Sequence, residues 1–188
     1  TLAGSSVHLV QENQTLNELI NLEDFIVISN PSQRQGKGGR PALVINNRKY
    51  IVKNLTQTDI QIPWGVEIVW AVITPLNITS ESSIQKIVLG SLYCKPGSKK
   101  KSALLDHIAE VYHLLCKKYQ NGLHWILAGD FNQLNEKKIL DISPTLKQVV
   151  STPTRSNPSA VLDKIITSLH SFYQIPAVKP PLDNDPDK

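Results

Sequence analysis

The chain of 188 residues contains no methionine and only two cysteines. Cys94 and Cys116 are too few for a disulfide framework and lack the spacing of zinc ligands, so we expect both to be reduced in an intracellular protein. Because the sequence begins at Thr1 and has no initiator methionine, we expect it to be part of a longer polypeptide. No apolar run reaches the roughly 18 residues of a membrane-spanning helix, so the sequence predicts no membrane association.

Charged residues are nearly balanced: 20 Lys and Arg stand against 16 Asp and Glu, which gives a net charge of +4. This small basic surplus is compatible with a polyanionic partner, although many soluble proteins carry one. With 40% hydrophobic residues, a chain of this length can bury one core without disulfide or metal cross-links. No repeat or linker divides the sequence, so we expect a single domain over residues 1–188.

Short runs rich in branched apolar residues predict strands. They cover residues 7–11, 25–28, 42–45, 50–54, 68–74, 87–94, 124–128 and 161–167. Because several of them follow one another without a helix between, we expect an antiparallel or mixed sheet rather than repeated strand–helix–strand units. The clearest helix is predicted over residues 102–119, where apolar side chains recur at helical spacing, and a shorter helical segment is expected over residues 15–22.

The most informative stretch is residues 125–134, WILAGDFNQL, in which an apolar strand leads into Gly-Asp-Phe-Asn. Gly129 permits a sharp turn, and the strand fixes the direction in which Asp130 and Asn132 emerge. Asp130 could accept a proton from an attacking water, and Asn132 could donate an amide hydrogen to a phosphoryl oxygen or to that carboxylate. The alternative is that the two residues only form an Asx turn at the strand end.

The segment LAGDFN resembles the signature of the endonuclease/exonuclease/phosphatase superfamily, which includes DNase I, abasic-site endonucleases and retrotransposon endonucleases. Other segments resemble motifs of this family in the same order. LVQEN resembles the early strand of the family, which implies that Glu12 is a magnesium ligand. IVLGSLYCKP resembles the strand that carries a catalytic tyrosine, which places Tyr93 near the scissile phosphate.

Two segments near the end of the chain, TPTR and VLDKIITS, resemble the pattern of non-LTR retrotransposon endonucleases. This resemblance implies a catalytic role for Asp163 and substrate contacts for Thr154 and Arg155. Each assignment has a structural alternative: Glu12 could be a solvated strand-end carboxylate, Tyr93 a packing residue, and Asp163 a turn cap. The order of the motifs along almost the whole chain is more specific than any one of them.

The sequence also departs from the family pattern. The family begins one strand earlier, with an asparagine in the metal region, and ends in a Ser-Asp-His strand. Neither motif is in this chain, and none of its five histidines lies in such a context. We therefore expect a domain that lacks the first strand and the final Ser-Asp-His strand, with impaired activity.

Basic residues gather just before the long helix. Lys99, Lys100 and Lys101 stand where the helix dipole disfavours cations, so either solvent or a phosphate backbone passing Tyr93 must favour them. We assign them to substrate binding, with Lys95 beside them. Residues 31–41 form a glycine-rich loop with three basic residues, a weaker candidate for the same role.

Together these features predict an α/β fold, a four-layer sandwich of two mixed β-sheets flanked by helices as in DNase I, and incomplete here. The implied activity is hydrolysis of DNA phosphodiester bonds by a nicking endonuclease that uses Mg²⁺, or Mn²⁺ in its place. The expected partner is DNA, and the expected context is a monomeric domain of a larger polyprotein acting in the nucleus. The alternatives are a phosphatase or lipid phosphodiesterase of the same superfamily, and an inactive remnant that binds nucleic acid.

Overall fold

The computed structural model describes residues 7–10, 22–29, 41–77, 84–120, 122–156 and 159–173. Its centre is a six-stranded mixed sheet. In spatial order this sheet contains β4 (Tyr50–Asn54), β5 (Glu67–Pro75), β6 (Lys86–Tyr93), β7 (Leu123–Asp130), β11 (Asp163–Thr167) and β8 (Lys147–Gln148). β6 and β7 are parallel, whereas the other neighbours are antiparallel.

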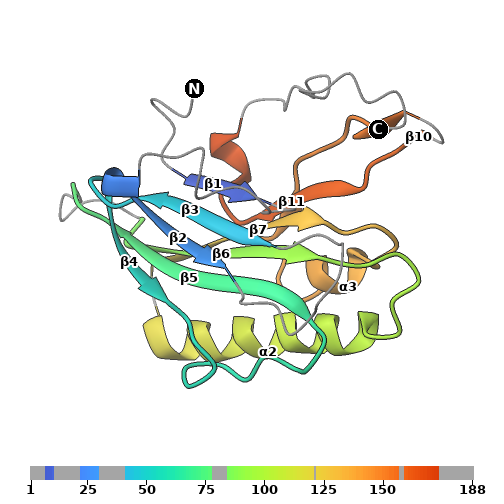
Figure 1. Cartoon of the computed structure of the whole chain (residues 1–188), viewed down its shortest axis with the longest axis horizontal. Helices are drawn as coiled ribbons and strands as arrows, with labels where there is room; N and C mark the ends of the chain where they lie inside the picture. Colours follow the sequence, from blue (N-terminus) through green and yellow to red (C-terminus); the bar gives the residue numbers. More distant parts are fainter. Residues whose placement is uncertain are drawn as a thin grey trace.

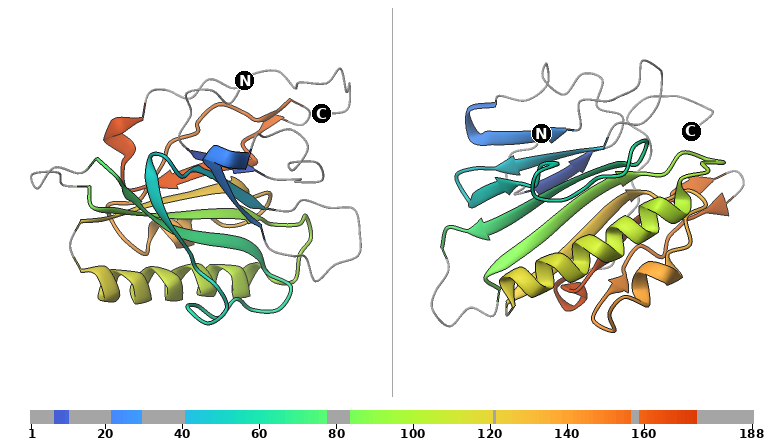
Figure 2. Two further views of the ribbon diagram at one scale, coloured as in Figure 1. Left: turned by 60° about the vertical axis from the view of Figure 1, so that its left-hand side comes forward. Right: turned by 90° about the horizontal axis from the view of Figure 1, so that it is seen from below.

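A smaller sheet lies against one face of the central sheet (Figure 1). It contains β1 (Val7–Val10), β3 (Ala42–Asn46) and β2 (Phe25–Ser29), all paired antiparallel. The opposite face of the central sheet is covered by α2 (Lys101–Tyr119), with the short helix α3 (Lys137–Leu140) beside it (Figure 2). The remaining elements are the β9 (Arg155–Ser156) and β10 (Ser159–Ala160) pair and two 3-10 turns, η1 (Leu22–Asp24) and η2 (His170–Phe172).

Two hydrophobic cores join these three layers. Between the sheets, Leu43 and Ile45 of β3 pack with Val69, Ala71 and Leu89 of β5 and β6. On the other face, alternate residues of the same strands point to the helices, as the period of two in a strand requires. These residues include Trp70, Val88 and Leu92, which pack with Leu127 of β7 and with Leu104, Ile108 and Val111 of α2.

Packing, rather than its first turn, holds α2 in place. Burial of Leu104, Ile108, Val111 and Leu115 contributes roughly 1.5–3 kcal/mol each. The lysines at its start cost only about 0.3–1 kcal/mol each against the helix dipole. The helix ends at Gln120, which has a left-handed φ of 51° and donates its N–H to the carbonyl of Cys116 at 2.9 Å.

The expected α/β class with a DNase I-like sandwich is confirmed, and the described residues supply three of its four expected layers. Every expected strand is present with its bounds shifted by no more than two residues, and the long helix begins one residue earlier than expected. β7 is longer than predicted and runs through Asp130. The segment 15–22, expected to be helical, lies outside the described residues except for its last position, and the loop 31–41 also lies outside except for Pro41.

Candidate active site

Four polar residues form a row across one end of the central sheet. Glu67 of β5 is the cross-strand partner of Tyr93 of β6, Tyr93 is the partner of Asp130 of β7, and Asp130 is the partner of Asp163 of β11. β6 and β7 end at this row, whereas β5 and β11 begin there. Because neighbouring strands lie about 4.8 Å apart, the four Cα atoms span about 14 Å.

These four side chains also share a face of the sheet. Val69, Ala71 and Leu89 point toward the three-stranded sheet. Glu67 and Tyr93 stand at even spacing from them along β5 and β6, so they point the same way. Tyr93 pairs with Asp130, and Asp130 pairs with Asp163, so the side chains of Asp130 and Asp163 point to the same face. Three carboxylates and a phenol are therefore adjacent on one surface, and they include the predicted site residues Tyr93, Asp130 and Asp163.

Asn132 is fixed beside Asp130 by its own backbone. Its φ of 44° is left-handed, its N–H donates to Oδ1 of Asp130 at 3.0 Å, and its Nδ2 donates to the carbonyl oxygen of Cys94 at 2.9 Å. The first of these hydrogen bonds is the Asx turn named above as the structural alternative. The turn orients both side chains, so it is compatible with the predicted site.

Gly129 allows β6 and β7 to approach each other just before Asp130. A Cβ at this position would lie 2.0 Å from the carbonyl oxygen of Leu92, and φ is 151°. Only glycine fits such a contact. The glycine of Gly-Asp-Phe-Asn therefore sets the pairing of Tyr93 with Asp130.

Thr154 fixes the start of β11. Its Oγ1 accepts hydrogen bonds from the N–H groups of Leu162 at 3.0 Å and Asp163 at 3.1 Å. The carbonyl of Leu162 in turn accepts the N–H of Phe131 at 2.8 Å, which ties this segment to the Asp130 loop. Thr154 thus positions Asp163, and its expected substrate contact stays a prediction.

β11 is also anchored from the opposite face. Lys164, next to Asp163, is buried, and its Nζ lies 2.6 Å from Oε2 of Glu136 at the start of α3. Burial raises the pKa of Glu136, but the hydrogen bond to Lys164, a backbone hydrogen bond and the positive charge of Lys164 together outweigh burial, and the net pKa is lowered. This ion pair holds β11 against the helical layer.

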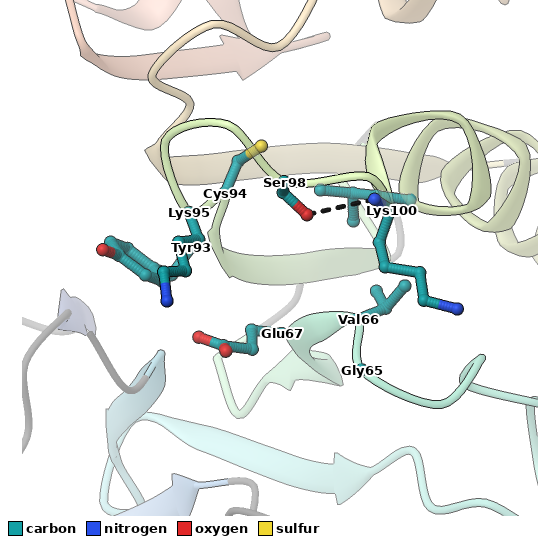
Figure 3. A pocket seen from close by; sticks show the side chains of 9 residues that line it. Gly65, Val66, Glu67, Tyr93, Cys94, Lys95, Ser98 and Lys100 are labelled. Atoms are coloured by element: carbon teal, nitrogen blue, oxygen red, sulfur yellow. Dashed lines mark hydrogen bonds between the residues drawn. The ribbon is translucent and has the colours of Figure 1, made fainter. Parts of the chain in front are cut away.

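A pocket opens beside the row on the side of β5 and β6. Glu67, Tyr93, Lys95, Ser98 and Lys100 contribute side chains to it (Figure 3). Tyr93, Lys95 and Glu67 gather on one side of this pocket, and Lys100 lies on the other. The pocket therefore combines an acidic and a phenolic group with two cations.

The three lysines assigned to substrate binding differ in their surroundings. Lys101 donates to Oε1 of Gln133 at 3.0 Å, which links α2 to the loop after Asp130. Lys100 lines the pocket, and Lys99 is exposed. Arg155, also expected to contact substrate, lies exposed in β9.

A metal site is only partly represented in the described residues. Glu12, the expected magnesium ligand, lies outside them, two positions after the end of β1. Within the ranges that the structure describes, no three His, Cys, Asp or Glu side chains group closely enough to hold an ion. Asp130 and Asp163 do supply the carboxylate oxygens that Mg²⁺ prefers, and Mg²⁺ is commonly held by only one or two carboxylates.

None of the histidines whose side chains the structure describes lies at the row of Glu67, Tyr93, Asp130 and Asp163. Register places His124 at the opposite end of β7, and His170 follows the opposite end of β11. His107 is buried between α2 and the central sheet, where its Nε2 accepts the N–H of Trp70 at 3.1 Å. A general acid for a leaving group is therefore not among these side chains.

Sequence reasoning missed Glu67 and the neighbouring Trp64. Glu67 opens an apolar strand, as Asp163 does in the structure, but it lies in none of the segments that resemble family motifs. Its relation to the site depends on the antiparallel register of β5 with β6, which places Glu67 beside Tyr93.

No protein-family model matches the chain, and no curated protein matches its sequence. Solved structures do match its fold. The catalytic domain of human Nocturnin with bound sulfate has a TM-score of 0.58 at 17% identity, over 88% of this chain and 70% of that one. ANGEL2, a 2′,3′-cyclic phosphatase, has a TM-score of 0.54 at 13% identity, over 86% and 69%.

D. rerio TDP2 complexed with a single-strand DNA product has a TM-score of 0.50 at 12% identity, over 94% of this chain and 73% of that one. These three proteins are hydrolytic enzymes of the endonuclease/exonuclease/phosphatase superfamily. No helix in the described ranges is long and apolar enough to cross a membrane. The described part of the chain has the DNase I-like fold of that superfamily.

Proposed function

We propose that this domain hydrolyses phosphodiester bonds in DNA, as a nicking endonuclease of the kind found in non-LTR retrotransposons. The observation that carries the proposal is the row of Tyr93, Asp130 and Asp163 on three adjacent strands, with Asn132 locked beside it. Its proposed context is a nuclear, monomeric domain of a larger polyprotein.

Each residue of the row has a role that its placement permits. Asp130, at the centre, accepts the proton of the attacking water. Asn132 has one amide hydrogen bound to the carbonyl of Cys94 and a second to donate to a phosphoryl oxygen. Tyr93 donates its hydroxyl hydrogen to the charge that develops on the phosphate. Asp163 orients the histidine of the Ser-Asp-His motif, which the 188 residues lack, and Thr154 and Arg155 flank the substrate.

Mg²⁺, or Mn²⁺ in its place, is proposed to bind through Glu12. When bound, such an ion neutralises negative charge on the phosphate. The residues of this chain then position water and substrate around it. A carboxylate is a suitable ligand for either ion.

A nicking assay on supercoiled plasmid with Mg²⁺ tests the proposal. We expect weak nicking by the wild-type chain, because no described histidine reaches the row. Asp130→Ala should lower the rate by about 10²- to 10⁴-fold while leaving DNA affinity nearly unchanged, since a general base acts on the transition state. Equal nicking by wild type and Asp130→Ala would refute the assignment.

Binding is tested separately by replacing Lys99, Lys100 and Lys101 together with alanine. For each phosphate that the protein no longer neutralises, the dependence of log affinity on log salt should flatten by about 0.9 for duplex DNA. The reaction of bound DNA should persist. An unchanged salt slope would mean that the three lysines are a solvated surface.

The fold leaves a second substrate class open, because ANGEL2 shares it and is a cyclic phosphatase. A panel containing plasmid DNA, a 2′,3′-cyclic nucleotide and a phosphomonoester separates the two. Turnover of the cyclic nucleotide without nicking, abolished in Asp130→Ala, would favour the phosphatase.

A further inference from the structure

Trp64 is the one tryptophan of this chain outside the cores. Its exposed fraction is 72%, whereas Trp70 is 1% and Trp125 4% exposed. A large aromatic ring left in water loses the free energy that burial would provide. Such rings are common where a partner with an apolar face covers them.

The backbone holds Trp64 in a fixed turn. The N–H of Val66 donates to the carbonyl of Pro63 at 3.1 Å, and Gly65 has a φ of 76°. A positive φ at the third residue is what a type II turn requires, and glycine supplies it without strain. The indole is therefore presented by a rigid segment, so little backbone entropy is lost when it binds a ligand.

A cation accompanies the ring. The Nζ of Lys100 lies 5.9 Å from the ring centroid of Trp64, within cation–π range. The side chain of Lys100 extends away from Tyr93 across the pocket (Figure 3). Lys99 and Lys101 adjoin it in sequence.

The turn is also close to the row of polar residues. Glu67, the partner of Tyr93, is three residues after Trp64, so their Cα atoms are at most about 11 Å apart. Gly65, Val66 and Glu67 line the same pocket as Tyr93 and Lys100. A ligand lying on Trp64 could therefore continue through this pocket to Asp130.

We propose that Trp64 and Lys100 form a stacking site for one unpaired nucleobase and its adjoining phosphate. This inference rests on the proposed function and names the form of nucleic acid that the site holds: a single strand or an unstacked end beside the scissile bond. Every base offers a π-face to an aromatic ring, and a neighbouring cation neutralises the phosphate. The composition favours nucleic acid over a protein partner, because interface cores between proteins are depleted in lysine.

Binding of a labelled 12-residue oligothymidylate, measured by fluorescence anisotropy without divalent metal, tests the site without any cleavage. Trp64→Ala should weaken binding about 5- to 150-fold, and Trp64→Phe should retain most of it, because a benzene ring also stacks. The matched control is Phe172→Ala. Phe172 is 71% exposed, but it follows the opposite end of β11. Its replacement should leave binding unchanged.

Salt dependence separates stacking from charge. Trp64→Ala should keep the log–log salt slope of the wild type, whereas Lys100→Ala should reduce it by about 0.7, the value for one phosphate of a single strand. Trp64→Ala should weaken the binding of a 12-base-pair duplex less than the binding of the single strand, because the bases of a duplex are already stacked on one another.

Acrylamide quenching gives a readout that needs no variant. Two of the three tryptophans are buried, so quenching reports mainly on Trp64, and the oligothymidylate should protect it. Unprotected fluorescence, or equal affinity of Trp64→Ala and Phe172→Ala, would overturn the inference and leave Trp64 as a contact for a protein partner. Failure of wild type to bind any DNA at low salt would overturn it as well. Nicking is measured separately, so the two proposals can fail independently. Binding that depends on Trp64 without nicking would contradict the proposed function, whereas nicking without such binding would contradict the stacking site.

Discussion

Gly129→Ala should damage the stability and the candidate site together. The added Cβ would lie 2.0 Å from the carbonyl oxygen of Leu92, and 2.9 and 3.0 Å from its carbonyl carbon and nitrogen. All three are backbone atoms, so no side chain can rotate away. β6 and β7 would have to separate by about 1.5 Å to restore an ordinary contact distance.

The magnitude follows from two contributions. Overpacking costs about 1–3 kcal/mol, and a non-glycine residue at a φ of 151° costs about 1–3 kcal/mol more. Urea denaturation should therefore show a loss of about 2–6 kcal/mol in the free energy of unfolding. Each kcal/mol lowers Tm by about 2–4 °C in a domain of this size. The plasmid nicking rate should fall by about 10²-fold, as expected for a 1 Å displacement of reacting groups.

Gly97→Ala is the matched control. Gly97 also has a positive φ, 69°, but nothing lies within 4 Å of an added Cβ. Only the conformational cost of a positive φ remains, about 1–2 kcal/mol. If Gly129→Ala proved as stable and as active as Gly97→Ala, the close approach of β6 and β7 would not be what positions Asp130.

Three further outcomes are expected. Thr154→Val, which leaves two N–H groups at the start of β11 without an acceptor, should cost about 1–3 kcal/mol in urea denaturation and lower the nicking rate; Thr154→Ser should restore both. Burial lowers the pKa of His107 below its ordinary value near 6.5, so the neutral form is favoured in the fold. Below pH 6.5 the unfolded chain takes up a proton at His107 more readily than the folded chain does. The free energy of unfolding should therefore be unaffected by His107 above pH 6.5 and fall below it, by at most about 1.36 kcal/mol per pH unit. Replacing the exposed His113 with Gln should leave this dependence intact. Glu136→Gln should destabilise more than Lys164→Met, because the lysine is the more deeply buried partner and is left without a counter-charge; the reverse order would contradict this account of the ion pair.

The sequence was sufficient for eight of the strands, for α2 and for the turn at Asp130. Runs of branched residues mark the strands, and helical spacing marks α2, because alternation and helical periodicity are local properties. Gly-Asp-Phe-Asn was informative for a similar reason: the turn at Asp130 is made by residues within the motif, as the hydrogen bond from Asn132 shows.

The missed features depend on contacts between distant segments. Glu67 lies beside Tyr93 only because β5 runs antiparallel to β6, and no local pattern specifies that register. The positioning of β11 by Thr154 depends on a hydrogen bond across nine positions. The ion pair of Lys164 with Glu136 joins elements 28 positions apart in the chain. α3, with only four residues, is too short for its periodicity to be recognised.

Backbone contacts, more than side-chain identity, determine where the polar row stands. Asp130 is placed by the approach of Gly129 to Leu92 and by the N–H of Cys94, which donates to the carbonyl of Asp130 at 2.8 Å. Asp163 is placed through main-chain N–H groups bound by Thr154. Most core positions need only an apolar side chain of suitable volume, so they can change while this frame persists. This explains how structures only 12–17% identical to this chain retain its fold, and why substitutions at Gly129 and Thr154 should affect the site more than conservative changes in either core.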